Sequence, residues 1–312
     1  MISSIFGKTK PINHIIVLTF LFLLYWIVHF FVSDSTNTNE QLLLKTLVLT
    51  VLLFSVFVVN FIVKRNKMTG PNSFAMLFYA MLMLVFPETL ADNNAILCSF
   101  FLLLATRRLI SVRSLKNIKL KIFDATLWVL ISSLFYEWAL IFFLLVFAAI
   151  YIYEPKNIRN WMVPFTGIFA FFVITYCILI LANNTSFLLE HYAFDLKFNV
   201  SYFLDWGNSS KFIIYIFIVL FTTVFSFLKL GKTGLGKIVT MRLVVLSFIL
   251  GILLKTLVST PGADPLMVTF FPAVIFITNY VESIQRANIT EVVLIASIFI
   301  PFLVFVSSLL LK

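Results

Sequence analysis

Two acids, Glu88 and Asp92, stand in the short segment FPETLADNN (residues 86–94) between long apolar runs. A third acid, Asp34, follows the first apolar run of the chain in a similar way. A carboxylate near a membrane surface can accept a proton from a hydroxyl group or bind a metal ion. Asp and Asn also end helices, and DNNA before an apolar run is typical of a helix N-cap. The three acids are therefore candidate catalytic bases, with helix capping as the alternative.

Lys255 and Glu137 are the other charged residues whose positions suggest chemistry. Lys255 lies in LLKTLVSTPGADP, about one turn before the expected end of an apolar span. It could bind the phosphate of a lipid carrier as a point charge, or extend to the lipid headgroups. Glu137 is enclosed by apolar sequence on both sides. Because ionisable residues inside a membrane are commonly functional, we take Glu137 as a candidate intramembrane acid.

The histidines and cysteines point to no metal site. Three scattered histidines and two cysteines inside apolar runs give none of the spacings that metal ligands need. His29 and His191 are more typical of hydrogen-bonded residues near the membrane surface than of catalysts. The sequence predicts no metal and no cofactor.

The composition indicates the elements that must position these residues. Of 312 residues, 62% are hydrophobic and 12% are charged, and the mean hydropathy is +1.08. Soluble domains have roughly 45–50% apolar and about 25% charged residues. The apolar runs are continuous rather than alternating, which favours helices over a β-barrel. We therefore expect an all-α polytopic transmembrane bundle that forms one integral-membrane domain over residues 1–312.

The expected spans follow from the length that a bilayer requires, roughly 20 apolar residues. Two regions need separate treatment. Residues 73–111 are broken by PETLADNN and predict a hairpin of two short helices, 73–87 and 95–111. Residues 124–153 are interrupted by Tyr136-Glu137-Trp138, so they form either one tilted helix or two short ones. The remaining spans are 12–32, 41–63, 162–181, 211–230, 243–259, 266–283 and 292–311.

The distribution of lysine and arginine favours two helices in 124–153. That choice gives about 11 spans, with a cytoplasmic N-terminus and an outer C-terminus, and it places most basic residues inside. With a single helix, GKTGLGKIVTMR would have to cross the membrane. The predicted basic inner loops are 64–72, 112–123, 154–161 and 231–242. The predicted outer loops are 33–40, 88–94, 182–210 and 260–265.

The placement of lysine and arginine beside the spans also explains the net charge of +10. The basic residues flank apolar segments, where they orient helices, so no nucleic-acid partner is expected. The run RRLISVRSLKNIKLK (107–121) could also bind anionic lipid headgroups or a protein partner on the inner face. GKTGLGKI (231–238) superficially fits a phosphate-binding loop, but Ile follows the lysine and no strand precedes it. We reject that interpretation.

Three segments resemble an uncharacterised integral-membrane family of flavobacteria: MISSIFGKTKPIN, LLATRRLISVRSLKNIKLKIFDATLWVLISSLFYEWALIF and RNWMVPFTG. This resemblance covers most of the chain. It implies an inner (cytoplasmic) membrane location and brings no function with it.

The order of features is also similar to that of the C-type (GT-C) glycosyltransferases, in layout and hydropathy. Acids follow the first span, FPETLADNN ends a hairpin, a basic inner loop leads to paired short helices, and TPGADPLMVTFFPAVIFI forms a late proline-bearing span. The resemblance implies an enzyme that moves a sugar from a polyprenyl-phosphate carrier to an outer-face acceptor. Asp34, then Glu88 or Asp92, would accept the proton, and Lys255 would hold the carrier phosphate. The sequence departs from the family in its short first outer loop and in the missing arginine near the late proline. Either the active site is rearranged, or the scaffold has lost its chemistry.

Two other classes of function remain open. The chain could be a non-enzymatic inner-membrane scaffold or a subunit of an envelope complex, using its helix surfaces and residues 107–121. A transporter is disfavoured, because most charges lie at the ends of spans rather than in the middle of the membrane.

Overall fold

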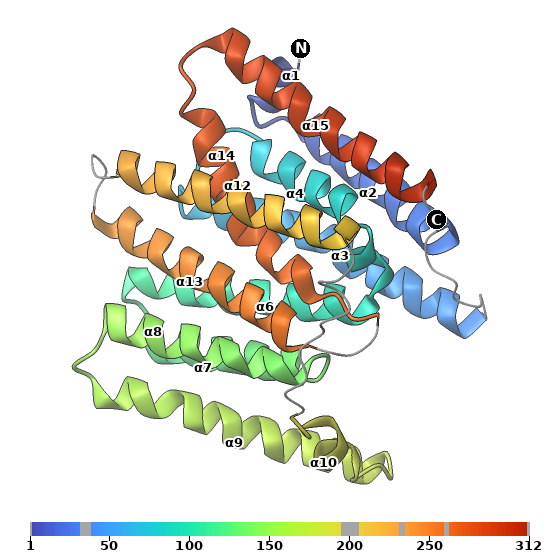
Figure 1. The fold of residues 1–312 in the computed structure, drawn as a ribbon. Helices are drawn as coiled ribbons and strands as arrows, with labels where there is room; N and C mark the ends of the chain where they lie inside the picture. The colour runs from blue at the N-terminus through green and yellow to red at the C-terminus, as the bar shows by residue number, and fades with distance from the viewer. Residues whose placement is uncertain (1, 32–38, 195–205, 231–234, 259–261, 311–312) are drawn as a thin grey trace.

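The computed structural model describes residues 2–31, 39–194, 206–230, 235–258 and 262–310. Asp34 lies outside these ranges, as do parts of the predicted loops 182–210, 231–242 and 260–265. Over the ranges described, every regular element is a helix, which confirms the all-α class (Figure 1).

Eight helical segments are long and apolar enough to cross a membrane, which makes the chain a multi-pass membrane protein. They are α2 (Pro11–Phe31), α3 (Asn39–Arg65), α6 (Asn93–Ser111), α9 (Ile158–Leu181), α12 (Trp206–Leu230), α13 (Leu235–Leu257), α14 (Phe270–Glu282) with the preceding 3-10 turn η3 (Pro265–Thr269), and α15 (Ala287–Leu310).

Three further segments are shorter than the eight. They are α4 (Phe74–Val85), α7 (Ile118–Ser133) and the pair formed by the 3-10 turn η2 (Glu137–Phe142) and α8 (Phe143–Tyr153), of which α4 and η2–α8 are apolar. The 12 residues of α4 span about 18 Å at ~1.5 Å per residue, against a hydrocarbon core of about 30 Å. The expected count of about 11 spans is therefore not confirmed, although a helix is present in each expected segment.

The chain does break within 124–153, as the distribution of basic residues predicts. Helix α7 ends at Ser133, Tyr136 has extended backbone angles (φ −142°, ψ 115°), and η2 begins at Glu137. The remaining short elements connect or flank the long helices: α1 (Ile2–Phe6), α5 (Glu88–Ala91), η1 (Val112–Ser114) and α10 (Phe187–His191).

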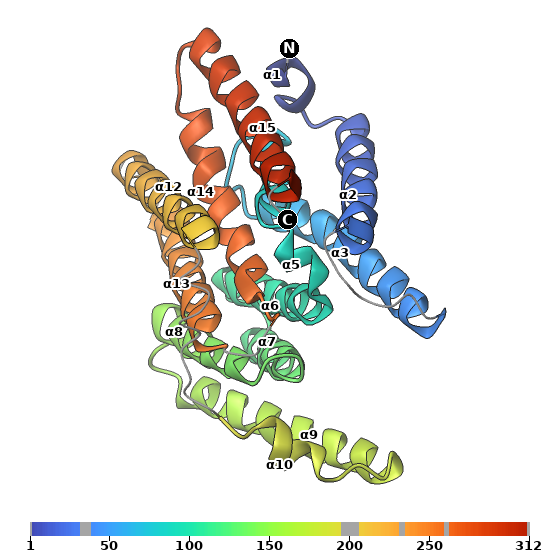
Figure 2. The same cartoon turned by 45° about the vertical axis from the view of Figure 1, so that its right-hand side comes forward.

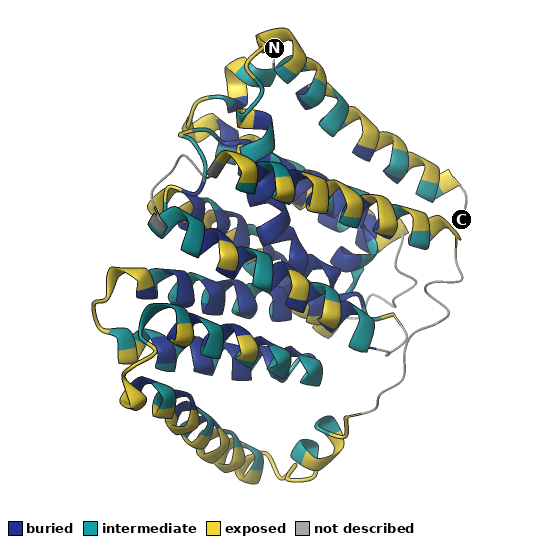
Figure 3. Ribbon diagram, turned by 60° about the vertical axis from the view of Figure 1, so that its left-hand side comes forward, coloured by how far each residue is buried: buried dark blue, intermediate teal, exposed yellow. Residues whose placement is uncertain are grey.

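Burial falls from the centre of the bundle to its edges. In their most apolar stretches, the segment η3–α14 is 78% buried and α6 is 61% buried, whereas α9 and α15 are each 17% buried. Figure 2 shows α9 with α10 at one edge of the molecule, and α2 with α15 toward the other. Figure 3 shows the buried centre between these exposed helices. The exposed apolar surfaces of α9 and α15 are surfaces that lipid would cover.

The connecting segments gather at two ends of the bundle. At one end, the Arg113 guanidinium lies against Gly236, and Lys229 Nζ donates a hydrogen bond to Ser283 O (2.9 Å). The end of α12 and the start of α13 lie at this end, on the left of Figure 1. The opposite end holds the segment 86–94 with Glu88 and Asp92. We call this end of the bundle the acidic end, and the first one the basic end. Loops that the positive-inside analysis assigns to one face therefore lie together in space.

A close contact at Gly251 sets how closely α13 packs against η3, which leads to the acidic end. A Cβ added at Gly251 would lie 2.7 Å from Thr269 Cγ2, closer than packed atoms can approach. We expect Gly251→Ala to lower the stability by about 1–3 kcal/mol, because overpacking must displace one of the two elements. Thermal unfolding in detergent measures this. Adding Thr269→Ser, which removes the opposing methyl group and keeps the hydroxyl, should restore the lost stability. An unchanged melting temperature in Gly251→Ala alone would contradict the packing described.

Candidate functional site

A buried ion pair lies at the centre of the acidic end. Lys255 Nζ is 3.0 Å from Asp264 Oδ1, and the two side chains are 4% and 7% exposed. Lys255 occupies the last turn of α13, and the Asp264 carboxylate caps η3 by accepting a hydrogen bond from the N–H of Leu266 (3.1 Å). Burial raises the pKa of the Asp264 carboxyl, and the Lys255 ammonium opposes that rise. The lysine predicted to bind a carrier phosphate thus has a carboxylate partner within the protein.

Asp92 joins this ion pair to two other segments. Its Oδ1 accepts hydrogen bonds from the N–H groups of Asn94 (3.0 Å) and Ala95 (3.2 Å), which makes it the N-cap of α6. Its Oδ2 accepts from the N–H of Asp264 (2.9 Å) and from the Tyr136 hydroxyl. Four donors thus surround one carboxylate. This geometry matches the capping alternative and leaves little room on the Asp92 carboxylate for a hydroxyl group of a substrate.

Glu88 forms a second ion pair at the same end. Its Oε1 lies 3.1 Å from Lys211 Nζ, near the start of α12, with the Glu88 side chain 37% exposed. The next turn of α12 carries Tyr215, whose hydroxyl lies 2.7 Å from Thr269 Oγ1 on η3. Glu88 and Lys211 therefore help to hold α5 and α12 together at this end.

An open pocket of about 460 Å³ lies beside this network. It is formed by the start of α6, the turn between α7 and η2, helix α10 and the segment before η3. Its lining residues are Asp92, Asn94, Leu134, Phe135, Tyr136, Glu137, Phe187, His191, Gly262 and Ala263.

Glu137 and His191 are the side chains of this pocket best placed for proton transfer. Glu137 is the first residue of η2 and is partly exposed, and among the described residues its carboxylate makes no hydrogen bond or ion pair. His191 Nε2 donates to Ser133 O (2.7 Å), and its ring stacks on Phe187 with centroids 5.0 Å apart. The histidine is thus oriented against the end of α7, and the carboxylate is left available to a substrate.

The five predicted site residues have different outcomes. Glu88, Asp92 and Lys255 lie at one end and are engaged with partners there, while Glu137 lines the pocket together with Asp92. Asp34 is outside the described residues. The roles of all five remain predictions: Asp34, Glu88 and Asp92 as catalytic acids, Lys255 in phosphate binding and Glu137 as an intramembrane acid. Within the part of the chain that the structure describes, no three His, Cys, Asp or Glu residues could hold a metal ion.

Sequence reasoning missed Asp264, Lys211 and the partnership of Tyr136 with Asp92. Asp264 had a detectable signal, because Asp before Pro265 is typical of an N-cap followed by proline at the first helical position. Lys211 and Tyr136 had none, since their partners are distant in the sequence.

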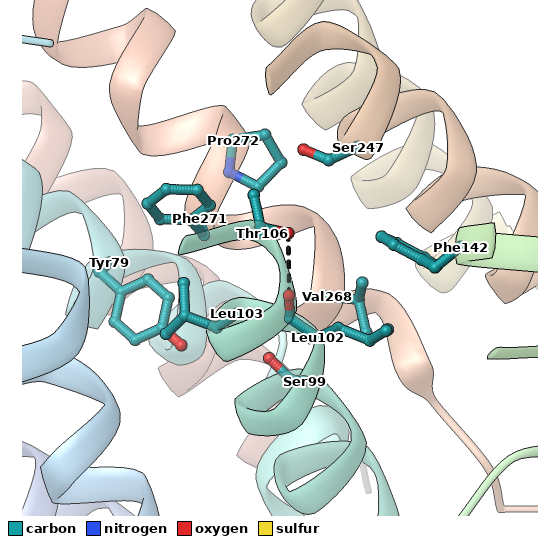
Figure 4. A pocket seen from close by; sticks show the side chains of 10 residues that line it. All are labelled: Tyr79, Ser99, Leu102, Leu103, Thr106, Phe142, Ser247, Val268, Phe271 and Pro272. Atoms are coloured by element: carbon teal, nitrogen blue, oxygen red, sulfur yellow. Dashed lines mark hydrogen bonds between the residues drawn. The ribbon is translucent and has the colours of Figure 1, made fainter. Parts of the chain in front are cut away.

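A second, enclosed cavity lies deeper in the bundle (Figure 4). Its volume is only about 10 Å³, and its hydroxyl groups bond to nearby carbonyls: Thr106 Oγ1 to Leu102 O (2.8 Å) and Ser247 Oγ to Val244 O (2.8 Å). Space of this size suits no more than one water molecule, so the cavity is a feature of the packing and not a substrate site.

The fold and the site together define a multi-pass helical membrane protein with a polar pocket at its acidic end. The chain matches no family model, and no curated protein or solved structure matches it. The candidate function therefore rests on the site.

Proposed function

We propose that this protein is a GT-C-like glycosyltransferase of the inner membrane that moves a sugar from a polyprenyl-phosphate carrier to an acceptor on the outer face. The observation that carries the proposal is the pocket at the acidic end, which presents the Glu137 carboxylate beside polar and aromatic side chains. Aromatic rings beside hydrogen-bonding groups suit a sugar bound near a lipid surface.

In the proposed reaction, the acceptor hydroxyl oxygen attacks C1 of the sugar. The bond from C1 to the carrier phosphate oxygen breaks, and the polyprenyl phosphate leaves with the electron pair. The Glu137 carboxylate takes the proton from the acceptor. We place Glu137 in this role ahead of Asp92, which has four donors, and of Glu88, which is paired with Lys211. Asp34 remains a further candidate base.

The carrier phosphate requires a positive charge, and Lys255 and Lys211 are two candidate cations among the described residues at this end. Each is paired with a carboxylate, so a phosphate would have to exchange places with Asp264 or Glu88. The Lys211–Glu88 pair is the more exposed of the two and would exchange at lower cost.

The proposed orientation has the N-terminus in the cytoplasm, the C-terminus outside, and α4, α7 and η2–α8 completing about 11 passes. It is supported by the grouping of the basic loops at the end opposite the pocket. In bacterial inner membranes, segments rich in lysine and arginine remain on the cytoplasmic side.

The alternative is a non-enzymatic scaffold or a subunit of an envelope complex, with a partner at residues 107–121. One observation favours it: Glu88 pairs with Lys211, Lys255 pairs with Asp264, and Asp92 accepts from the Asp264 N–H. These contacts hold helices together, as they would in a protein without catalysis.

Turnover of polyprenyl-phosphate sugars by the purified protein in lipid vesicles separates the two functions. The transferase releases polyprenyl phosphate from such a donor, and Glu137→Gln abolishes most of that release. A scaffold releases none, and its function survives the replacement of Glu137.

A further inference from the structure

Another open pocket, of about 360 Å³, lies at the basic end of the bundle, opposite the proposed active site. It opens between the start of α7 and the start of α9. Its lining residues are Leu115, Asn117, Ile118, Lys119, Leu120, Asn157 and Asn160. The lining thus contains one cation, three amide side chains and no acid.

The first turn of α7 lines this space and carries hydrogen-bond donors. The backbone N–H groups of residues 118–120 have no helical acceptor, because they begin the helix. Asn117, at the N-cap position, makes no side-chain capping bond to them. Helix α7 is 16 residues long, so its N-terminus carries the partial positive charge of the helix dipole. Such a terminus is a ready binding site for an anion.

Asn160 gives independent evidence for a ligand. It lines the pocket and is only 1% exposed, yet its side-chain nitrogen Nδ2 has no hydrogen-bond partner in the described residues. An amide donor that is buried without a partner costs free energy, and native structures avoid this cost unless another group supplies the acceptor. Asn157, by contrast, caps α9 by accepting from the N–H of Arg159 (3.2 Å).

The rim of the pocket suits a lipid. Leu115 is 55% exposed and Leu120 is 64% exposed, and both line the opening. Ile158, at the start of α9, is 75% exposed. Exposed apolar side chains beside Lys119 match the boundary between acyl chains and phosphates at a membrane surface.

We propose that this pocket binds a phosphate group, carried by the headgroup of an anionic membrane lipid. The phosphate oxygens accept from the first N–H groups of α7, from the Asn160 amide and from the Lys119 ammonium. The acyl chains lie along Leu115 and Leu120. This site is independent of the proposed transferase activity and would hold the basic end against the inner leaflet.

Native mass spectrometry of the full-length protein in detergent tests the site. Phosphatidic acid and diacylglycerol with the same acyl chains are titrated separately, since they differ only in the phosphate. We expect the wild type to retain one phosphatidic acid at least about tenfold more tightly than diacylglycerol, the effect of one or two hydrogen bonds to a charged group. Asn160→Leu and Lys119→Gln should each remove most of that preference. Lys119 is exposed, so its replacement leaves folding intact.

The matched control is Lys67→Gln, which removes the same charge from the same end but away from the pocket. It should leave the preference unchanged. Equal retention of both lipids, or an equal loss in Lys67→Gln and Lys119→Gln, would overturn the proposal in favour of diffuse attraction. Inorganic phosphate is the third probe. If it displaces phosphatidic acid at submillimolar concentration, the pocket binds free phosphate and the lipid source is wrong.

Discussion

Glu137→Gln is expected to slow sugar transfer by about 10²–10⁴-fold, the usual contribution of a general base. Glutamine has nearly the shape of glutamate but cannot take a proton from the acceptor. Because the Glu137 carboxylate makes no hydrogen bond or ion pair with the described residues, its replacement removes no contact that supports the fold. The variant should therefore lose activity while its melting temperature stays unchanged.

The measurement is the release of polyprenyl phosphate from a polyprenyl-phosphate sugar by protein reconstituted in vesicles. Glu190→Gln is the matched control, because Glu190 is an exposed acid on α10 that does not line the pocket. The control should retain full activity. If both variants are as active as the wild type, Glu137 is not the base. If the wild type itself turns over no such donor, the transferase proposal fails as a whole.

The helices and their grouping at two ends could be predicted from the sequence. Both depend on local properties: an apolar run long enough to form a helix, and lysine or arginine beside its end. The break at Tyr136-Glu137-Trp138 was ambiguous by hydropathy. The basic residues of the following loops favoured two helices, and α7 does end at Ser133, although two membrane passes are not confirmed. The capping alternative for Asp92 was also visible, because an N-cap bonds to residues two and three positions later.

The partners of the candidate residues could not be predicted. Asp92 bonds to Tyr136, 44 positions away, and to Asp264, 172 positions away. Hydropathy says which residues are in helices but not which helix faces meet, so it gives no information about such pairs. The pocket beside Glu137 depends in the same way on how α10 packs against the end of α7.

The buried ion pair gives the second prediction with a large effect. Lys255→Met should lower the stability by about 3–5 kcal/mol, because it leaves Asp264 buried without its counter-ion. The matched control is Lys211→Met. Its pair with Glu88 is more exposed, so its loss should cost about 1 kcal/mol or less. Thermal unfolding in detergent compares the two variants.

The loss of stability in Lys255→Met should also depend on pH. Burial raises the pKa of the Asp264 carboxyl, and removing the ammonium that opposes this effect raises it further. The folded variant then holds a proton that the unfolded chain releases, so its stability falls as the pH rises above the ordinary pKa of an aspartate. The difference from the wild type should be smaller near pH 5 than near pH 8. A difference that is the same at both would contradict a role for the Asp264 charge.

The double variant Lys255→Met/Asp264→Asn separates stability from phosphate binding. It removes both charges, and replacing a whole buried pair costs far less than breaking it. We expect it to regain most of the stability that Lys255→Met loses. If it transfers sugar as fast as the wild type, Lys255 is a structural residue and the carrier phosphate is bound elsewhere, with Lys211 the next cation to replace. If it folds like the wild type but does not turn over the donor, the loss of activity comes from chemistry rather than from unfolding, as expected if Lys255 binds the carrier phosphate.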